Sequence, residues 1–316
     1  MNSNLNAPQF RDEQAAYDYV ESILWPAGPV CPHCGNCAQD RITKLQGKST
    51  RIGTRKCKEC RKPFTVKVAT IFEDSKAPMT HWLQAIYLMC SSKKGISARQ
   101  LQRMLGGSMK TAWFMAHRIR HAMAPGADAG PLGGEGVTVE ADETYLAKSK
   151  KTRKAPGVGL NAKPAPMVFS LVERNGNIRS MYLDDKNIRG AMAKHLDERS
   201  RLVTDGAQTY KFVMPTPEQH ESVDHSKHEY VRGDVHTNTL EGFFSIFKRG
   251  LVGTYQHMDK KHLDRYLAEF DFRQNTRAKL GINDTQRTAL AVAGAKGKRL
   301  TYRRPDPKEV ESRERL

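Results

Sequence analysis

The sequence lacks long apolar runs, and hydrophobic residues make up only 38% of its 316 positions. No stretch approaches the roughly 18 consecutive apolar residues that would span a membrane. The first ten residues, MNSNLNAPQF, also lack the basic and apolar segments of a secretory signal. We therefore expect a protein that stays in the cytoplasm and has no membrane partner. At roughly 100–200 residues per domain, the length suggests two or three domains.

Cysteine is scarce except in one short segment. Six cysteines are too few for a disulfide scaffold in a chain of this length, and five of them lie within residues 31–60. Two CxxC pairs, in CPHCG and CKEC, are separated by 22 residues. Each pair can direct two thiolates to one side of a tight turn, and four thiolates form the closed tetrahedral site typical of structural zinc. We predict Zn²⁺ bound by Cys31, Cys34, Cys57 and Cys60.

Alternatives to this zinc site remain open from the sequence. Cys37 and His33 lie close to the first pair and could each substitute for a ligand. The paired cysteines could also be buried or redox-active thiols without a metal. Cys90 lies in the apolar run WLQAIYLMC and is expected to be an ordinary core thiol.

Acidic residues are nearly absent from residues 41–120. This segment has 18 lysines and arginines but only three acids, so it carries most of the net charge of +18 and suggests a polyanionic partner, first of all nucleic acid. Within it, ARQLQRML and MKTAWFMAHRIRHAM predict two helices around a Gly106-Gly107 turn. We expect a helix-turn-helix whose second helix enters the major groove of double-stranded DNA, with Lys110, Arg118 and Arg120 on phosphates or base edges.

Three acids stand out in the second half of the chain. After a Gly- and Pro-rich stretch at 124–136, the pattern predicts three strands, a helix, a fourth strand, an irregular stretch and another helix. Asp142 lies in the first strand, Asp205 ends the fourth strand, and Glu241 lies in the last helix. This order matches a ribonuclease H-like α/β fold, a mixed sheet flanked by helices. Three converging carboxylates can hold two Mg²⁺ ions for in-line phosphoryl transfer.

Residues near these acids offer further candidates. Lys248 lies seven residues after Glu241, two helical turns on and on roughly the same face, where it can meet a DNA phosphate. Asn238 precedes Glu241 by one turn and could be a neutral third ligand, but we favour Glu241 because it carries charge. The remaining possibilities are that His236 joins the site and that Glu140 or Glu143 substitutes for Asp142.

With these residues the chain resembles bacterial insertion-sequence transposases of the DDE superfamily, in the group related to eukaryotic Merlin elements. The matching stretches include CPHCG, CKECRKPFTVKVATIFEDSKAPMTHW, EADETY, LVTDG and HTNTLEGFFSIFKRGLVGTYQH. The resemblance implies a zinc-ribbon and helix-turn-helix front that recognises terminal inverted repeats. It also implies that Asp142, Asp205 and Glu241 are the catalytic acids and Lys248 their basic helper. Some members use Asn as third ligand, which keeps Asn238 a candidate.

The expected organisation follows from these observations. We predict an N-terminal helix and zinc ribbon at 1–66, a helix-turn-helix domain at 67–123, a linker at 124–136, a ribonuclease H-like catalytic domain at 137–285, and a basic, flexible tail at 286–316. The expected protein is a DNA transposase that acts as a homo-oligomer on DNA, with structural Zn²⁺ and two catalytic Mg²⁺ ions. The alternatives are a DNA-binding regulator with a catalytically silent domain, and a metal-dependent nuclease.

Overall fold

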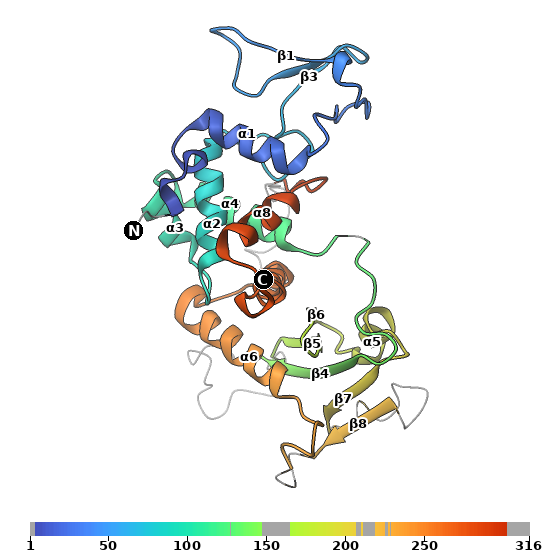
Figure 1. The fold of residues 1–316 in the computed structure, drawn as a ribbon. Helices are drawn as coiled ribbons and strands as arrows, with labels where there is room; N and C mark the ends of the chain where they lie inside the picture. The colour runs from blue at the N-terminus through green and yellow to red at the C-terminus, as the bar shows by residue number, and fades with distance from the viewer. Residues whose placement is uncertain are drawn as a thin grey trace, which may run out of the picture. The chain divides into compact units, whose positions relative to one another are not determined.

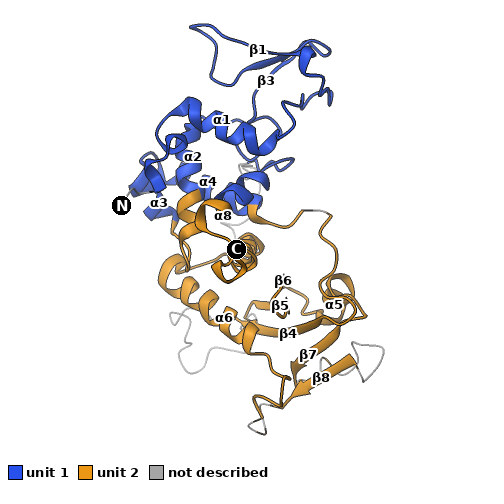
Figure 2. Cartoon of the chain, viewed as in Figure 1, with its two compact units in different colours: residues 1–86, 98–122, 288–316 blue, residues 87–97, 123–287 orange. Residues whose placement is uncertain are grey.

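The computed structural model describes residues 4–126, 128–146, 165–206, 210, 219–224, 227 and 229–301. The chain divides into two compact units, coloured separately in Figure 2. The first comprises residues 1–86, 98–122 and 288–316, and the second comprises residues 87–97 and 123–287. Each unit is built from segments that are distant in the sequence.

The first unit begins with a helix and a small antiparallel sheet. Helix α1 spans Glu13–Leu24 and starts at Asp12, whose carboxylate accepts a 2.7 Å hydrogen bond from the Ala15 amide. Strands β1 (Ile42–Lys44), β2 (Arg55–Cys57) and β3 (Pro63–Phe64) form the sheet in that order. Its small core includes Ile42, Phe64 and two cysteines, with Trp25 packed against it. So small a core needs another source of stability, such as a metal.

Three helices form the rest of the front half of the chain. They are α2 (Met79–Ser91), whose last turn belongs to the second unit, α3 (Ala98–Leu105) and α4 (Met109–Met123). The two glycines between α3 and α4, Gly106 and Gly107, have φ of 79° and 78°, where a side chain would be strained. Ser108 then caps α4 by accepting a 3.1 Å hydrogen bond from the Thr111 amide. The expected pair of helices around a tight turn is therefore present.

The segment from residue 286 differs from the flexible tail expected from its composition. Helix α8 spans Asp284–Ala293, and Ala291, Val292 and Ala295 are fully buried. Two basic side chains beyond the helix also have partners in the first unit. Lys298 donates to the Ala122 carbonyl at 3.0 Å, and Arg299 pairs with Asp74 at 2.7 Å. The short apolar stretch of α8 is therefore folded and buried despite the many charged residues around it. Residues 302–316 lie outside the described residues.

The second unit is built on a five-stranded mixed sheet with the order β6-β5-β4-β7-β8 (Figure 1). The strands are β4 (Thr138–Tyr145), β5 (Met167–Glu173), β6 (Ile178–Leu183), β7 (Arg201–Asp205) and β8 (His220–Val223). The first three pair antiparallel, whereas β7 runs parallel to both β4 and β8. The short edge strand β8 was not predicted, because it lies in a stretch with little apolar alternation.

Helices cover both faces of this sheet, and the strands alternate between them. In β5, Val168 and Val172 join one apolar core, which contains α6 (Asn238–Gly250) and α7 (Leu263–Asn275). Phe169 and Leu171 join the opposite core, which contains α5 (Ile188–His195). Such alternation is what a buried strand with period 2 requires. In β4, Val139 and Ala141 face α5, so Asp142 faces α6.

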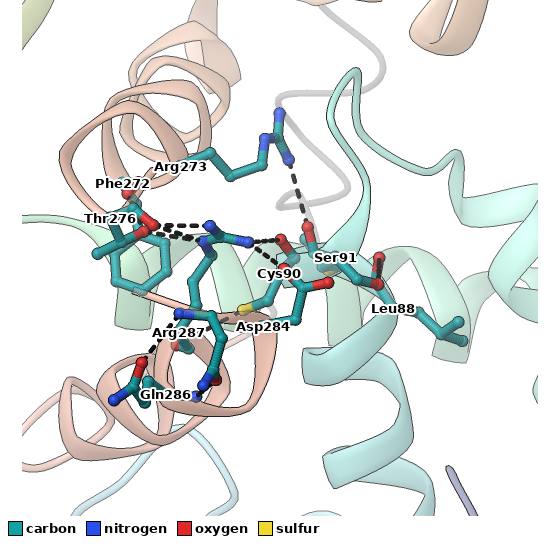
Figure 3. A network of polar contacts seen from close by, with 11 residues as sticks. Leu88, Cys90, Ser91, Phe272, Arg273, Thr276, Asp284, Gln286 and Arg287 are labelled. Carbon is teal, nitrogen blue, oxygen red and sulfur yellow. Dashed lines mark hydrogen bonds and ion pairs between the residues drawn. The ribbon is translucent and has the colours of Figure 1, made fainter. Parts of the chain in front are cut away.

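Buried arginines secure the end of α2 within the second unit (Figure 3). Arg287 donates to the Cys90 carbonyl at 3.0 Å and to the Thr276 carbonyl at 2.7 Å, and Arg273 donates to the Met89 carbonyl at 3.4 Å. The last carbonyls of a helix have no partner inside it, so these guanidinium groups satisfy them. Cys90 is 1% exposed, as expected for a core thiol.

The remaining described elements are short. They are 3-10 turns at Asn4–Asn6, Pro8–Phe10, Gln39–Arg41, Lys260–His262 and Ala278–Leu280, and a π turn at Leu251–Tyr255. Among the helices in the described part of the chain, none combines the length and the apolar character that a membrane crossing needs.

Candidate metal centres and catalytic site

The four predicted zinc ligands come together at one end of the small sheet. The sulfur atoms of Cys31, Cys34, Cys57 and Cys60 all lie within 4.8 Å of one another. The Cys31–Cys60 and Cys34–Cys57 sulfur pairs are 3.6 and 3.7 Å apart. A tetrahedral site with Zn–S bonds of about 2.3 Å requires sulfurs about 3.8 Å apart. The donor set and its spacing therefore fit structural Zn²⁺.

Local backbone turns produce this arrangement. The Gly35 amide donates to the Cys31 carbonyl at 2.9 Å, and Gly35 has φ of 75°, which closes the first CxxC turn tightly. The Cys57 amide donates to the Lys62 carbonyl at 3.2 Å across the second turn. Cys37 is exposed and is not part of the cluster, so the alternative ligand suggested by the sequence is not needed.

The three predicted DNA-contacting residues of α4 have different environments. Lys110 is exposed in the first turn of the helix. By contrast, Arg118 and Arg120 are only 6% and 1% exposed. Arg118 donates to the carbonyls of Ile71 at 2.9 Å, Glu73 at 2.7 Å and Leu300 at 3.1 Å. These two arginines belong to the interior of the unit, and the expectation that they touch DNA was wrong.

Helical spacing could have revealed this burial. Arg118 lies three residues after Met115 and four before Ala122, and both of these neighbours are buried. Arg120 follows the buried Ala116 by four residues, so it shares the same kind of inward face. The sequence argument gave weight to charge and overlooked the periodicity of the apolar residues around it.

The acids Asp142 and Asp205 are neighbours across the centre of the large sheet. Strands β4 and β7 run parallel, with Ala141 opposite Thr204. Asp142 and Asp205 are the next residues along the two strands, just beyond this last pair, and they are close enough for the charge of Asp205 to act on Asp142. Glu241 lies in the first turn of α6, on the sheet face to which Asp142 points.

The charges of Asp205 and Glu241 both act on Asp142. Burial and the negative charge of Asp205 raise the pKa of the Asp142 carboxyl to about 7, and Glu241 adds to the effect. The amide of Glu143, which donates to Asp142 at 2.7 Å, opposes it. A bound cation would reduce the repulsion between these like charges. Carboxylate oxygens are hard ligands of the kind that Mg²⁺ prefers, so this donor set fits Mg²⁺.

The two candidate sites differ in how far they are formed. In the described part of the chain, the cysteine group alone places three or more His, Cys, Asp or Glu ligand atoms close enough to share one ion. The carboxylates are close enough to interact electrostatically without forming such a cage. Catalytic sites commonly tighten only when their ligands are bound.

Helix α6 carries the other candidates along one side. Asn238 is its first residue, Glu241 follows one turn later, and Lys248 lies two further turns along. All three are exposed. His236, considered as an additional member of the site, instead has its Nδ1 atom 3.6 Å from a carboxylate oxygen of Glu140.

The two acids that flank Asp142 have partners of their own. Glu140 is completely buried and accepts hydrogen bonds from the Thr239 and Leu240 amides at 3.0 and 3.4 Å. Glu143 points to the opposite face of the sheet and accepts a hydrogen bond from the hydroxyl of Tyr210, which lies in the α5 core. Neither is placed as a substitute for Asp142. The contacts of Glu140 and Tyr210 join distant segments, so the sequence carried little signal for them.

Comparisons with known proteins find transposase-related matches for both halves of the chain. A transposase zinc-ribbon domain matches residues 11–63, and an ISXO2-like transposase domain matches residues 131–275. The chain is also 29% identical, over 304 residues, to an uncharacterized protein in transposable element ISH50 of Halobacterium salinarum. That alignment covers 90% of this chain and 98% of the relative. The chain therefore carries a segment that matches a transposase zinc ribbon, followed by one that matches an ISXO2-like transposase domain.

Proposed function

We propose that this transposase binds the terminal inverted repeats of a mobile element and cuts and joins DNA by Mg²⁺-dependent phosphoryl transfer. The observation that carries the proposal is the interaction of three carboxylates from three elements, Asp142 of β4, Asp205 of β7 and Glu241 of α6. The strand order and directions of the sheet support a ribonuclease H-like catalytic domain.

Each residue of the proposed site has a distinct task. Asp142 and Asp205 would hold the metal ions from the sheet, and Glu241 would hold them from the helix. Two bound Mg²⁺ ions would activate the attacking oxygen and stabilise the leaving oxygen of an in-line displacement. Lys248, two turns along α6 from Glu241, would contact a DNA phosphate and hold the strand in register. Asn238, one turn before Glu241, is the alternative third ligand.

The N-terminal half of the chain would bind the DNA. Helices α3 and α4 meet at a tight Gly106-Gly107 turn, as in a helix-turn-helix, and Lys110 is exposed just after that turn. We propose that this end of α4 approaches the inverted repeat, while the zinc ribbon stabilises the front domain. Cutting and joining two element ends together requires two catalytic sites, so a homo-oligomer on DNA is the expected active form.

Three single substitutions test this function. Asp142→Ala, Asp205→Ala and Glu241→Ala should each retain binding to the element ends but lose cleavage and joining, because each removes a metal ligand. The assay follows Mg²⁺-dependent release of a 3′-OH end from labelled inverted-repeat DNA, with strand transfer scored on a supercoiled target. Arg249→Ala, on an exposed part of the same helix, is the control and should remain active.

The outcomes separate the alternatives. Cleavage without joining by the wild-type protein would indicate a nuclease. End binding with neither reaction, in Mg²⁺ or Mn²⁺, would indicate a DNA-binding regulator. If Asn238→Ala abolished activity while Glu241→Ala kept it, the third ligand would be the asparagine.

A further inference from the structure

We propose that Glu140 is a positioning residue that holds the start of α6, and with it Glu241, against the strand that carries Asp142. The inference rests on the proposed function, because it concerns the spacing of the proposed metal ligands. It assigns a task to a buried acid that lies outside the set of three acids described above.

The contacts of Glu140 join β4 to the first turn of α6. One carboxylate oxygen accepts from the Thr239 amide at 3.0 Å and the Leu240 amide at 3.4 Å, and the other accepts from the Thr239 hydroxyl at 2.9 Å. The first amides of a helix have no partner inside it. Thr237, which precedes α6, makes no side-chain capping hydrogen bond. Glu140 thus caps this helix from another element.

The charge of Glu140 is balanced where it lies. Its side chain is 0% exposed, and a buried carboxylate is costly unless it is paired and hydrogen-bonded. Arg174 at the end of β5 supplies the opposite charge, with its Nε atom 3.2 Å from the carboxylate. Arg174 also donates to the His236 carbonyl at 3.1 Å, so the same pair holds the segment that leads into α6. The positive end of the helix dipole adds further stabilisation.

The position of these contacts connects them to the site. Glu140 and Asp142 are two residues apart and share one face of β4, and Thr239 and Glu241 are two residues apart in α6. One carboxylate therefore fixes the helix to the strand within two residues of a proposed ligand on each side. If the start of α6 moved, Glu241 would move relative to Asp142 and Asp205. Mg²⁺ demands near-ideal octahedral geometry and would bind less well.

The test compares two substitutions of buried acids. Glu140→Gln keeps the size of the side chain but places an NH₂ group where amide donors converge. The control is Asp271→Asn, because Asp271 is also buried and accepts hydrogen bonds from the Ser180 amide and hydroxyl at 2.6 and 2.7 Å, but it joins α7 to β6. Both variants should lose stability. Only Glu140→Gln should change metal binding.

The readouts are metal binding and the metal dependence of cleavage. Binding of Mn²⁺ to the full chain without DNA is measured by electron paramagnetic resonance, and cleavage of inverted-repeat DNA is followed across a Mg²⁺ titration. In Glu140→Gln, both the Mn²⁺ dissociation constant and the Mg²⁺ concentration for half-maximal cleavage should rise by roughly 10–100-fold, as for other residues that orient metal ligands. End binding should not change. Thr239→Val, which removes one donor to Glu140, should give a smaller rise in the same direction.

The results distinguish a failure of this inference from a failure of the proposed function. If the wild-type chain binds Mn²⁺ and cleaves DNA, and Glu140→Gln shows the same metal dependence as Asp271→Asn, Glu140 is only structural. If Glu140→Gln does not fold, an unchanged metal dependence in Thr239→Val overturns the inference instead. A wild-type chain that neither binds Mn²⁺ nor cleaves overturns the proposed function and this inference together.

Discussion

Asp142 and Asp205 directly follow the paired Ala141 and Thr204 on two parallel strands, and their charges interact. Burial and the charge of Asp205 raise the pKa of Asp142 to about 7. A carboxyl in this state is close to half protonated at neutral pH in the metal-free chain. The electrostatic cost of keeping both acids ionised is what a divalent cation would remove.

Neutralising Asp205 should therefore lower the pKa of Asp142. In the metal-free Asp205→Asn variant we expect this pKa to fall below about 7 but to stay above the ordinary value of 3.8, because burial, the largest cause of the shift, persists. Glu241→Gln should lower it less, since Glu241 contributes less. Carboxyl carbon chemical shifts followed by NMR across pH measure the change. An unchanged pKa in Asp205→Asn would mean that the two side chains do not interact.

The zinc site gives a prediction about folding. The purified chain should contain one Zn²⁺, and Cys57→Ser should lose the metal and unfold the ribbon around residues 31–64, because the binding energy of a structural site is folding energy. The exposed Cys37 is outside the cluster, so Cys37→Ser is the matched control and should retain full zinc content.

Elemental analysis and amide hydrogen exchange measure these two effects. A zinc-free wild-type chain whose ribbon amides are still protected from exchange would contradict a structural metal. Retention of zinc by Cys57→Ser together with its loss from Cys37→Ser would reassign the ligands.

The sequence predicted most of the elements that carry the sites, because their signals are local. The CxxC spacing predicted a cluster that the structure brings together, and the alternating apolar residues around Asp142 predicted its strand. The charge of Asp205 acts on Asp142, in keeping with their expected convergence, whereas the assignment of metal ligands and DNA contacts stays a prediction.

What the sequence did not predict depends on contacts between distant segments. The capping of α6 by Glu140 joins residues 99 positions apart, and no local pattern indicates it. The edge strand β8 lacks clear apolar alternation and is defined by its pairing with β7. The segment from residue 286 was expected to be flexible because its many charged residues were given more weight than its short apolar stretch. In the structure, two alanines and one valine of that stretch are fully buried.

The buried carboxyl of Asp271 should make stability depend on pH. Burial raises its pKa from 3.8 to about 7, against the opposing hydrogen bonds from Ser180. The folded chain then holds a proton that the unfolded chain has already lost. The contribution of Asp271 to stability is therefore greatest below about pH 4, and it declines by about 1.4 kcal/mol per pH unit as pH rises to about 7.

Removing this carboxyl should remove that part of the pH dependence. Asp271→Asn should show a smaller decline in the free energy of unfolding between pH 5 and pH 7 than the wild-type chain, both measured by urea unfolding without metal. Asp284→Asn, which removes a half-exposed carboxylate, is the control and should follow the wild-type slope. Equal slopes for wild type and Asp271→Asn would show that Asp271 is ionised throughout.

Helix α4 allows stability and DNA binding to be separated by two substitutions. Arg118 is buried and satisfies three backbone carbonyls, so Arg118→Ala should lower the free energy of unfolding by at least about 2 kcal/mol, because charged hydrogen bonds are lost and the carbonyls stay buried. Lys110 is exposed, so Lys110→Ala should leave stability within about 0.5 kcal/mol of wild type.

The effects of the two substitutions on DNA binding should have the opposite order, with Lys110→Ala the more damaging. If the start of α4 contacts a phosphate through Lys110, Lys110→Ala weakens binding to all sequences and reduces the slope of log affinity against log salt concentration by about one. Below its unfolding temperature, Arg118→Ala should keep the wild-type salt slope, since the Arg118 guanidinium is buried and bonded to backbone carbonyls. Urea unfolding and fluorescence anisotropy at several salt concentrations measure both quantities. A reduced salt slope in a folded Arg118→Ala, with none in Lys110→Ala, would mean that the helix uses a different face for DNA.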